Sequence, residues 1–253
     1  TALRSLMEEK CSEEGLKLHF PSPIYCTDNA AMIGVAAYFE YLNENFKDLK
    51  IVQFSDINYP FVINMNKIRN VVNQINYLNP DIVIFNGNLL NSKINDNQKE
   101  SLINELKKIN AKYAKLYVYG DKDSLNSANI LNKANFKELT YEEIYDINNN
   151  KLILANKDHV DKYTDILVSH SPDEYLNFKN LTNIKLVLSG RSLGGLIRLP
   201  YLPCLIKFKG AKTYCKDLEK EKDTNILVSS GIGNNKLPFR LFNHPSINLI
   251  RFK

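Results

Sequence analysis

Short apolar runs alternate with amphipathic segments from residue 49 to the middle of the chain. The runs KIVQF, DIVIF and KLYVY each lead into a polar loop, which is typical of buried strands. Between and after these runs, apolar residues recur every three or four positions, so we expect helices at residues 64–78, 97–109 and 125–134. Alternating strands and helices predict an α/β domain.

The second half of the chain contains apolar runs but few helical patterns. The runs DILVSH, IKLVLSG, NILVSSG and INLIRF are each closed by polar residues or glycine. Strands that lack intervening helices bury their apolar sides against another sheet, so we expect a second sheet packed on the first. The predicted fold is an α/β sandwich of two packed β-sheets flanked by helices.

The opening segment has a different pattern. A helix is expected up to Gly15, followed by the short strand LKLHF and two prolines. A second helix is expected from about Asn29 to Leu42, with Thr27 or Asp28 at its start. This helix-strand-helix segment ends in a polar connector, which predicts a separate unit at the start of the chain.

Composition narrows the class of protein. Hydrophobic residues make up 44% of the 253 residues, enough for a buried core, and no apolar stretch approaches the ~18 to 20 residues of a membrane-spanning helix. The net charge of +5 is spread over Lys-rich and Glu-rich helices, which does not favour nucleic-acid binding. Four cysteines without Cys-x-x-Cys spacing are expected to be reduced thiols. We therefore expect a cytoplasmic protein without membrane contact, of unknown oligomeric state.

Five polar loops at the predicted strand ends are the candidate site: SDIN, NGNL, GDKD, VSHSP and SGRSLGG. In this order and spacing they resemble the calcineurin-like metallophosphoesterases, whose motifs are Asp-x-His, Gly-Asp, Gly-Asn-His-Asp, a lone His and Gly-His-x-His. SGRSLGGLIRLP resembles the SGHTHGGQIRLP block of one subfamily. The resemblance covers residues ~49 to 253 and implies the calcineurin-like phosphoesterase sandwich.

The resemblance assigns roles in the first, second and fourth loops. Asp56 stands at the first metal-binding aspartate, and Asn58 stands where the family has His. Asn88 occupies the position of the carboxylate that bridges the two metals. His170 matches the lone His ligand. A neutral amide binds a metal weakly, so Asn88 cannot neutralise a charge shared between two ions.

The third and fifth loops also depart from the pattern. Gly-Asn-His-Asp reads here as glycine followed by Asp121, Lys122 and Asp123, so Lys122 replaces the His that protonates the leaving group. Arg191 and Leu193 replace both histidines of the last motif. The resemblance thus implies a degenerate site in which Lys122 and Arg191 supply positive charge where metals are bound in the family.

Three interpretations of this site remain open. The loops are those of an inactive, decayed domain with a structural or regulatory role, or Lys122 and Arg191 bind a phosphate-bearing small molecule without cleaving it. The third interpretation is a residual phosphoesterase with one divalent ion (Mn, Fe or Zn). The resemblance leaves Asp56 as a ligand of the first metal, and His170 with Asp121 as ligands of the second.

The opening segment resembles another family. The run CTDNAAMIG is similar to the C-terminal end of the tRNA N6-adenosine threonylcarbamoyltransferases, which have an actin-like ATPase-type fold. The resemblance implies that Asp28 ligates a metal together with an upstream His-x-x-x-His motif, which these 253 residues lack. Asp28 is otherwise explained as a helix N-cap, and tRNA is a partner only through the missing upstream domain. We expect domains at 1–46 and 47–253, joined by a natural fusion or by neighbouring reading frames.

Overall fold

The structure is a computed structural model, which describes residues 33–39, 49–145, 151–198, 204–215, 217–234 and 239–252. The chain divides into two units, Thr1–Ala31 and Met32–Lys253, and every element described below belongs to the second. Asp28 and the predicted opening helix and strand lie outside the described residues. The domain boundary at residues 46 and 47 stays a prediction.

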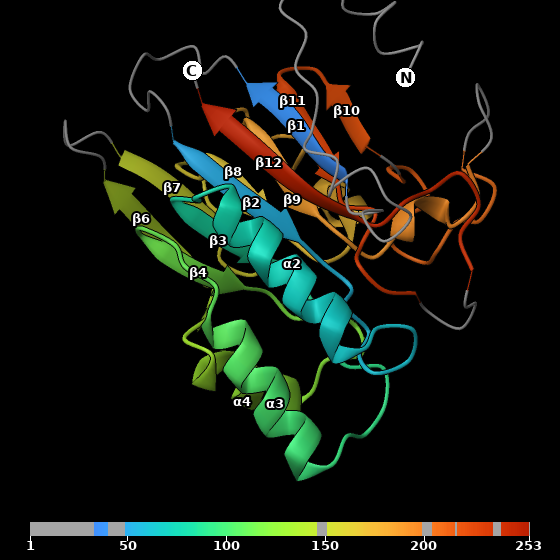
Figure 1. The fold of residues 1–253 in the computed structure, drawn as a ribbon. Coiled ribbons are helices and arrows are strands. Elements are labelled where there is room, and N and C mark those ends of the chain that lie inside the picture. Colours follow the sequence, from blue (N-terminus) through green and yellow to red (C-terminus); the bar gives the residue numbers. More distant parts are fainter. Residues whose placement is uncertain are drawn as a thin grey trace, which may run out of the picture. The chain divides into compact units, whose positions relative to one another are not determined.

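The first sheet combines parallel strands with an antiparallel neighbour (Figure 1). In spatial order it contains β1 (Ile33–Phe39), β12 (Ser246–Phe252), β2 (Lys50–Phe54), β3 (Ile82–Phe85), β4 (Ala114–Tyr117) and β5 (Lys137–Glu138). The strands from β2 to β5 are parallel, while β12 runs antiparallel to β2 and parallel to β1. The carboxyl ends of β2 to β5 therefore share one edge.

The second sheet repeats this plan. In spatial order it contains β10 (Asp217–Glu221), β11 (Thr224–Val228), β9 (Leu186–Ser189), β8 (Ile166–Val168), β7 (Lys151–Asn156) and β6 (Tyr141–Tyr145). The four central strands are parallel, and the outer strands β10 and β6 are antiparallel to their neighbours. The second sheet that the apolar runs predict is thus confirmed.

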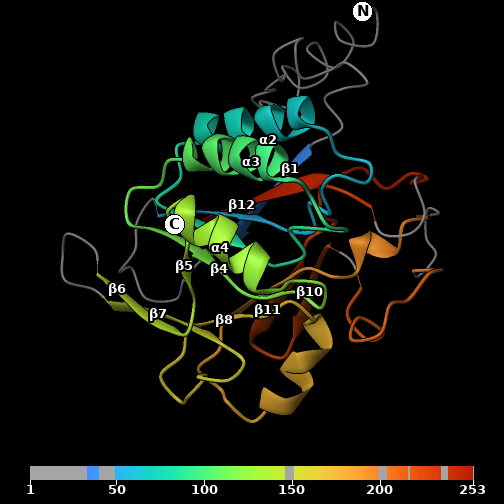
Figure 2. The same ribbon diagram turned by 90° about the horizontal axis from the view of Figure 1, so that it is seen from below.

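Side chains of β2, β3, β4 and β12 are buried on both faces of the first sheet, because one face packs against helices and the other against the second sheet. In β2, Ile51 packs into the core between the two sheets, whereas Val52 and Phe54 pack under the helices. The helices α2 (Met65–Tyr77), α3 (Asp96–Lys107) and α4 (Leu125–Lys133) cover that outer face (Figure 2). A smaller cluster on the second sheet includes Tyr175 of the 3-10 helix η3 (Pro172–Phe178).

Local sequence signals explain where the helices begin. The side chain of Asn64 accepts a hydrogen bond from the backbone N–H of Lys67 at the start of α2. At the start of α3, Asn95 and Gln98 form a reciprocal capping box. The predicted helices at 64–78, 97–109 and 125–134 are confirmed to within two residues at each end.

Three expectations are wrong or incomplete. The predicted helix at 29–42 contains strand β1 instead, because the backbone of residues 33–39 pairs in parallel with β12 at the sheet edge. The apolar runs singled out in the sequence do not include β5, β6, β7 and β10. Cys204 and Cys215 form a disulfide, so the expectation of reduced thiols is wrong for this pair. The two cysteines are eleven residues apart in a loop that sequence spacing did not mark as a site of pairing.

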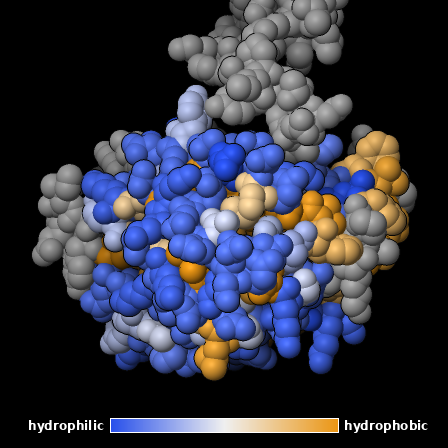
Figure 3. Space-filling view, turned by 60° about the horizontal axis from the view of Figure 1, so that its bottom comes forward, coloured by the Kyte–Doolittle hydropathy of each residue, from blue (hydrophilic) through white to orange (hydrophobic). Residues whose placement is uncertain are grey.

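The face of the molecule in Figure 3 is mostly hydrophilic, and apolar side chains appear there in small groups. Among the described residues, no helix combines the length and the apolar character needed to cross a membrane.

Candidate functional site

The loops that follow β2, β3, β8 and β9 meet at one edge of the two sheets. The backbone N–H of Asp56 donates to the Gly87 carbonyl at 2.9 Å, which joins the loops after β2 and β3. The Asp56 carboxylate accepts from the backbone N–H of Arg191, after β9, at 3.0 Å. Gly190 N–H donates to the carbonyl of His170, after β8, at 3.1 Å. The structure therefore brings the predicted residues of these loops together.

Asn88 lies at the centre of a buried hydrogen-bonded cluster. Its Nδ2 donates to Asp56 Oδ1 at 2.9 Å and lies 2.9 Å from His170 Nε2. Its Oδ1 accepts from the backbone N–H of Lys122 at 3.0 Å. Because that N–H can only donate, this bond assigns the oxygen and nitrogen positions of the Asn88 amide. Asp56 is 1% exposed, and Asn88 and His170 are each 5% exposed. All three polar positions of the amide are thus used inside the protein.

The hydrogen bonds of His170 define its tautomer. Nδ1 lies 2.5 Å from the carbonyl oxygen of Asn86. A carbonyl can only accept, so Nδ1 carries the proton and Nε2 is left as an acceptor for the Asn88 amide. Two acceptors, Asp56 Oδ1 and His170 Nε2, therefore converge on one NH₂ group.

Asp123 fastens the loop after β4 to the loop after β3. Its carboxylate accepts from the backbone N–H groups of Asn88 at 2.6 Å, Leu89 at 2.9 Å and Gly120 at 2.8 Å. The loops approach so closely that a Cβ on Gly87, which has φ +84°, would lie 2.3 Å from the Gly120 nitrogen. Only glycine fits at this contact. Asp123 thus holds Asn88 in its place.

Lys122 is held beside the cluster by amide side chains. Its Nζ donates to Oδ1 of Asn58 at 3.2 Å and to Oδ1 of Asn91 at 2.5 Å. Asn58 is 1% exposed, and its own amide nitrogen donates to the Asp56 carbonyl at 3.3 Å. Asn58 and Asn91 therefore fix the position of the ammonium group.

Arg191 and Leu193 fill the last loop differently from the family's two histidines. The Arg191 guanidinium forms an ion pair with Asp121, and its Nε donates to the carbonyl of Lys209. Burial lowers the pKa of Arg191, and the attraction of Asp56 opposes this shift. Leu193 is 1% exposed and apolar. Arg191 thus links two loops, while Leu193 packs in the interior.

Five predicted site residues have a left-handed backbone, with φ between +49° and +64°: Asp56, Asn58, Asn88, Arg191 and Leu193. Asp and Asn adopt this region readily, but Arg and Leu do so at a cost of about 1–2 kcal/mol each. Such backbone strain persists only where the surroundings hold it, and it is concentrated at functional sites. Arg191 and Leu193 therefore have backbone conformations that the surrounding loops must hold in place.

The motifs do not single out Arg240, which lies near the cluster. Its guanidinium donates to Asn234 Oδ1 at 2.6 Å and to three backbone carbonyls of residues 230–233 at 2.5 to 3.2 Å. Burial lowers the pKa of Arg240 to about 10; Asp56 opposes this shift and Arg198 adds to it. A partly buried cation is therefore available to balance the charge of Asp56. The available signal was an arginine within the apolar run FRLF.

Amide side chains also join the two sheets beneath the cluster, and sequence reasoning missed them. Asn248 donates to Gln53 at 3.0 Å, and Gln53 donates to Asn86 at 3.0 Å. Asn86 Nδ2 donates to the carbonyls of Ser169 at 3.0 Å and Leu188 at 2.8 Å in the other sheet. All three amides are at most 2% exposed. The sequence signal for these residues was a polar amide within or at the end of an apolar strand, because a buried amide needs hydrogen-bond partners.

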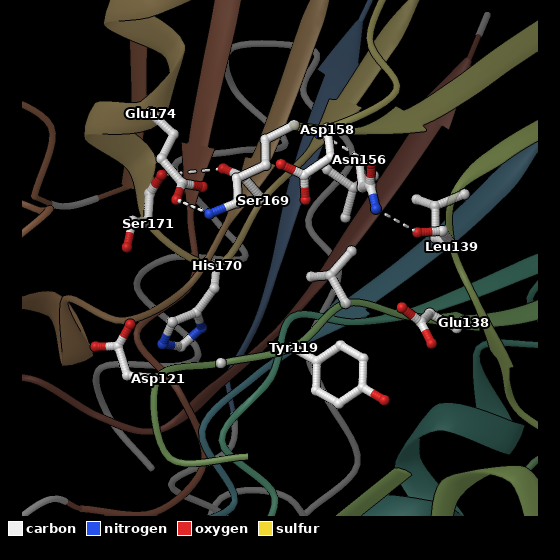
Figure 4. Close-up of a pocket in the computed structure, with 14 residues that line it drawn as sticks. Tyr119, Asp121, Glu138, Leu139, Asn156, Asp158, Ser169, His170, Ser171 and Glu174 are labelled. Carbon is white, nitrogen blue, oxygen red and sulfur yellow. Dashed lines mark hydrogen bonds and ion pairs between the residues drawn. The ribbon is translucent and has the colours of Figure 1, made fainter. Parts of the chain in front are cut away.

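A pocket of about 230 Å³ opens beside His170 (Figure 4). Its lining includes four carboxylates, those of Asp121, Glu138, Asp158 and Glu174. Two of them are offset, because Lys157 pairs with Glu174 at 2.8 Å and Arg191 pairs with Asp121. The remaining negative charge disfavours a phosphate group in this pocket.

The side chains present do not fit a dinuclear metal centre. No group of three or more His, Cys, Asp or Glu side chains in the described ranges could hold an ion. The Asn88 amide directs its N–H groups at Asp56 and His170, the two side chains that the resemblance assigns as ligands. An N–H group cannot coordinate a metal, and it occupies the lone pairs that would. Asp121, the third predicted ligand, pairs with Arg191.

Comparison with known proteins supports the phosphoesterase resemblance. No family model matches the sequence. The "Uncharacterized metallophosphoesterase YkuE" of Bacillus subtilis strain 168 is 28% identical over 235 residues, which cover 82% of this chain and 80% of that protein. The chain is similar to a metallophosphoesterase over most of its length. The two-sheet α/β architecture is consistent with such a fold.

A second curated relative matches a short segment. The tRNA N6-adenosine threonylcarbamoyltransferase of Clostridium perfringens strain ATCC 13124 is 51% identical over 51 residues, or 20% of this chain. The match spans 15% of the transferase. Among solved structures, the protein TT1561 of Thermus thermophilus aligns with a TM-score of 0.45 and 12% identity over 73% of this chain and 90% of that one.

Proposed function

We propose that this chain contains a metallophosphoesterase-like domain that does not hydrolyse phosphate esters and that binds a phosphate-bearing small molecule. The observation that carries the first part is the Asn88 amide, whose nitrogen lies 2.9 Å from both Asp56 Oδ1 and His170 Nε2. In the family resemblance Asp56 and His170 are ligands of two neighbouring metals; here both accept from one NH₂ group. The cluster is complete without a cation.

The chemistry of the remaining groups supports this proposal. Metal-assisted hydrolysis needs ions that generate hydroxide and neutralise the phosphate, which contributes several kcal/mol. Lys122 and Arg191 carry only donors, so they suit phosphate binding better than activation of water. His170, the imidazole of the cluster, already uses both ring nitrogens. Recognition of phosphate therefore remains as the supported role, with Lys122 as its first candidate.

The test is metal content and turnover of the full chain, purified after expression with added Mn. We expect well below one equivalent of Mn, Fe or Zn, and no hydrolysis of an aryl phosphate above that of an Asp56→Ala control. Two tightly held ions per chain, or Mn-stimulated turnover abolished by Asp56→Ala, would establish the hydrolase instead.

A second candidate is a part of a fused tRNA-modifying enzyme, favoured by the 51% identity to a threonylcarbamoyltransferase. A blot of source cells with an antibody against residues 49–253 tests this. A natural fusion gives one band with the combined mass of a transferase and this domain. A band of the phosphoesterase-like domain alone would exclude it.

A further inference from the structure

A larger pocket, of about 600 Å³, is lined in part by Lys122 from the loop after β4. Its other walls come from the loop between β3 and α3, the start of α3 and the start of α4. A pocket of this volume is in the range that accommodates small organic ligands.

Three lysines against one carboxylate make this pocket basic. Lys93, Lys99 and Lys122 line it, and Asp96 is its acidic residue. Within the described ranges, neither Lys93 nor Lys99 forms an ion pair. Their charges are therefore available to a ligand, and lysines on three separate elements favour an anion over a neutral molecule.

The polar lining is partly fixed before any ligand binds. Asn91 accepts a hydrogen bond from Lys122 Nζ at 2.5 Å and so holds that ammonium group at the pocket. Ser124 precedes α4, and its side chain makes no capping hydrogen bond, which leaves its hydroxyl free to donate to a ligand. Positioning that is already in place reduces the entropic cost of binding.

The same pocket also has apolar walls. Leu90, Ile94 and Ile130 are among its lining residues. A ligand that pairs an anionic group with an apolar or aromatic body would contact both parts of the surface. Free phosphate would leave the apolar part unused.

From these observations we infer that this pocket, which we call the basic pocket, binds a small phosphate monoester with an apolar body. The inference rests on the proposed function in taking phosphate as the ligand group, and it goes further in naming the pocket, the lysines and the shape of the ligand. Lys93, Lys99 and Lys122 bind the phosphate, and Ser124 donates to it.

Phenylphosphonate is the probe, because it has the charge of a phosphate monoester and an aromatic ring but cannot be hydrolysed. Saturation-transfer NMR on the full chain should show binding that weakens about tenfold in a Lys93→Gln/Lys99→Gln variant and weakens with added salt. Lys107→Gln/Lys133→Gln is the matched control, since it removes the same charge from the far ends of α3 and α4. It should bind as the wild type does.

A variant of opposite sign keeps the test independent of folding. Asp96→Asn removes the acidic residue and should tighten phenylphosphonate binding about twofold. Equal binding by the Lys93→Gln/Lys99→Gln variant and its control would overturn the assignment of this pocket but leave phosphate binding by the chain standing. No binding by the wild type would overturn both the pocket and the phosphate-binding part of the proposed function. Neither result bears on the absence of hydrolysis, which metal content and turnover test separately.

Discussion

The buried cluster around Asn88 and the basic pocket are neighbours with opposite properties. In the cluster each of the acceptors Asp56 Oδ1 and His170 Nε2 already meets an N–H group, and exposure is at most 5%. In the basic pocket, Lys93 and Lys99 line open volume and form no ion pair within the described ranges. Lys122 belongs to both, because its backbone N–H donates to Asn88 while its side chain lines the pocket.

The comparison teaches where a ligand can gain free energy. A molecule that enters the cluster must replace hydrogen bonds that the protein already makes, so it gains little. A phosphate in the basic pocket forms new charge-assisted bonds. The position that the family resemblance marks as catalytic is therefore the internally satisfied one, and binding is expected beside it.

Asn88→Asp should have the largest effect on stability, because it removes the NH₂ donor shared by Asp56 and His170. The new carboxylate replaces an NH₂ donor, so three groups that accept hydrogen bonds face one another in a buried space. We expect the free energy of unfolding to fall by about 3 kcal/mol in the absence of metal, measured by urea denaturation. Added Mn should recover part of the loss, because three acceptors form a site for a cation.

Asn91→Asp is the control for that change. It makes the same substitution beside Lys122, where the Asn91 oxygen already accepts from the ammonium group. Stability should change by no more than about 0.5 kcal/mol. Equal effects of the two substitutions would mean that the Asn88 amide is not needed between Asp56 and His170.

Arg240→Met comes next, since it removes the partly buried cation near Asp56. The guanidinium donates to Asn234 and to three backbone carbonyls, so its loss leaves acceptors unpaired. We expect a decrease of about 2 kcal/mol in the free energy of unfolding. Arg69→Met, at an arginine whose side chain is 54% exposed, should cost less than about 0.5 kcal/mol. If Arg240→Met left the free energy of unfolding unchanged, Asp56 would need no counter-charge.

Much of the fold could be predicted from the sequence, because both sheets are built mainly from buried parallel strands. Such strands appear as continuous apolar runs, as in IVIF of β3 and ILV of β8. The outer strands β6 and β10 carry charges in the runs YEEIY and DLEKE, so they have no such signal. The run KLILAN of β7 is apolar, so it does carry the sequence signal of a buried strand. Strand β1 forms by pairing with β12, which is more than 200 residues away in the sequence, and local propensity does not reveal such a pairing.

The candidate site was predictable in its membership but not in its internal bonding. The order of the loops was enough to predict that Asp56, Asn88 and His170 lie together. The direction of the Asn88 amide depends on the Lys122 N–H from another loop, which no local pattern encodes. Arg240 contacts carbonyls rather than a motif residue, so its role depends on tertiary structure.

Arg191→Ala should have the smallest effect, and it separates two sources of positive charge. The guanidinium already pairs with Asp121 and donates to the Lys209 carbonyl, and Arg191 does not line the basic pocket. Removing it should therefore weaken phenylphosphonate binding by no more than about twofold, against about tenfold for Lys93→Gln/Lys99→Gln. The alanine variant keeps the backbone N–H of residue 191, which donates a hydrogen bond to the Asp56 carboxylate, so the cluster should stay intact. If Arg191→Ala instead abolished binding while the lysine variant bound normally, the phosphate would lie at the last loop, and the cluster rather than the basic pocket would be the ligand site.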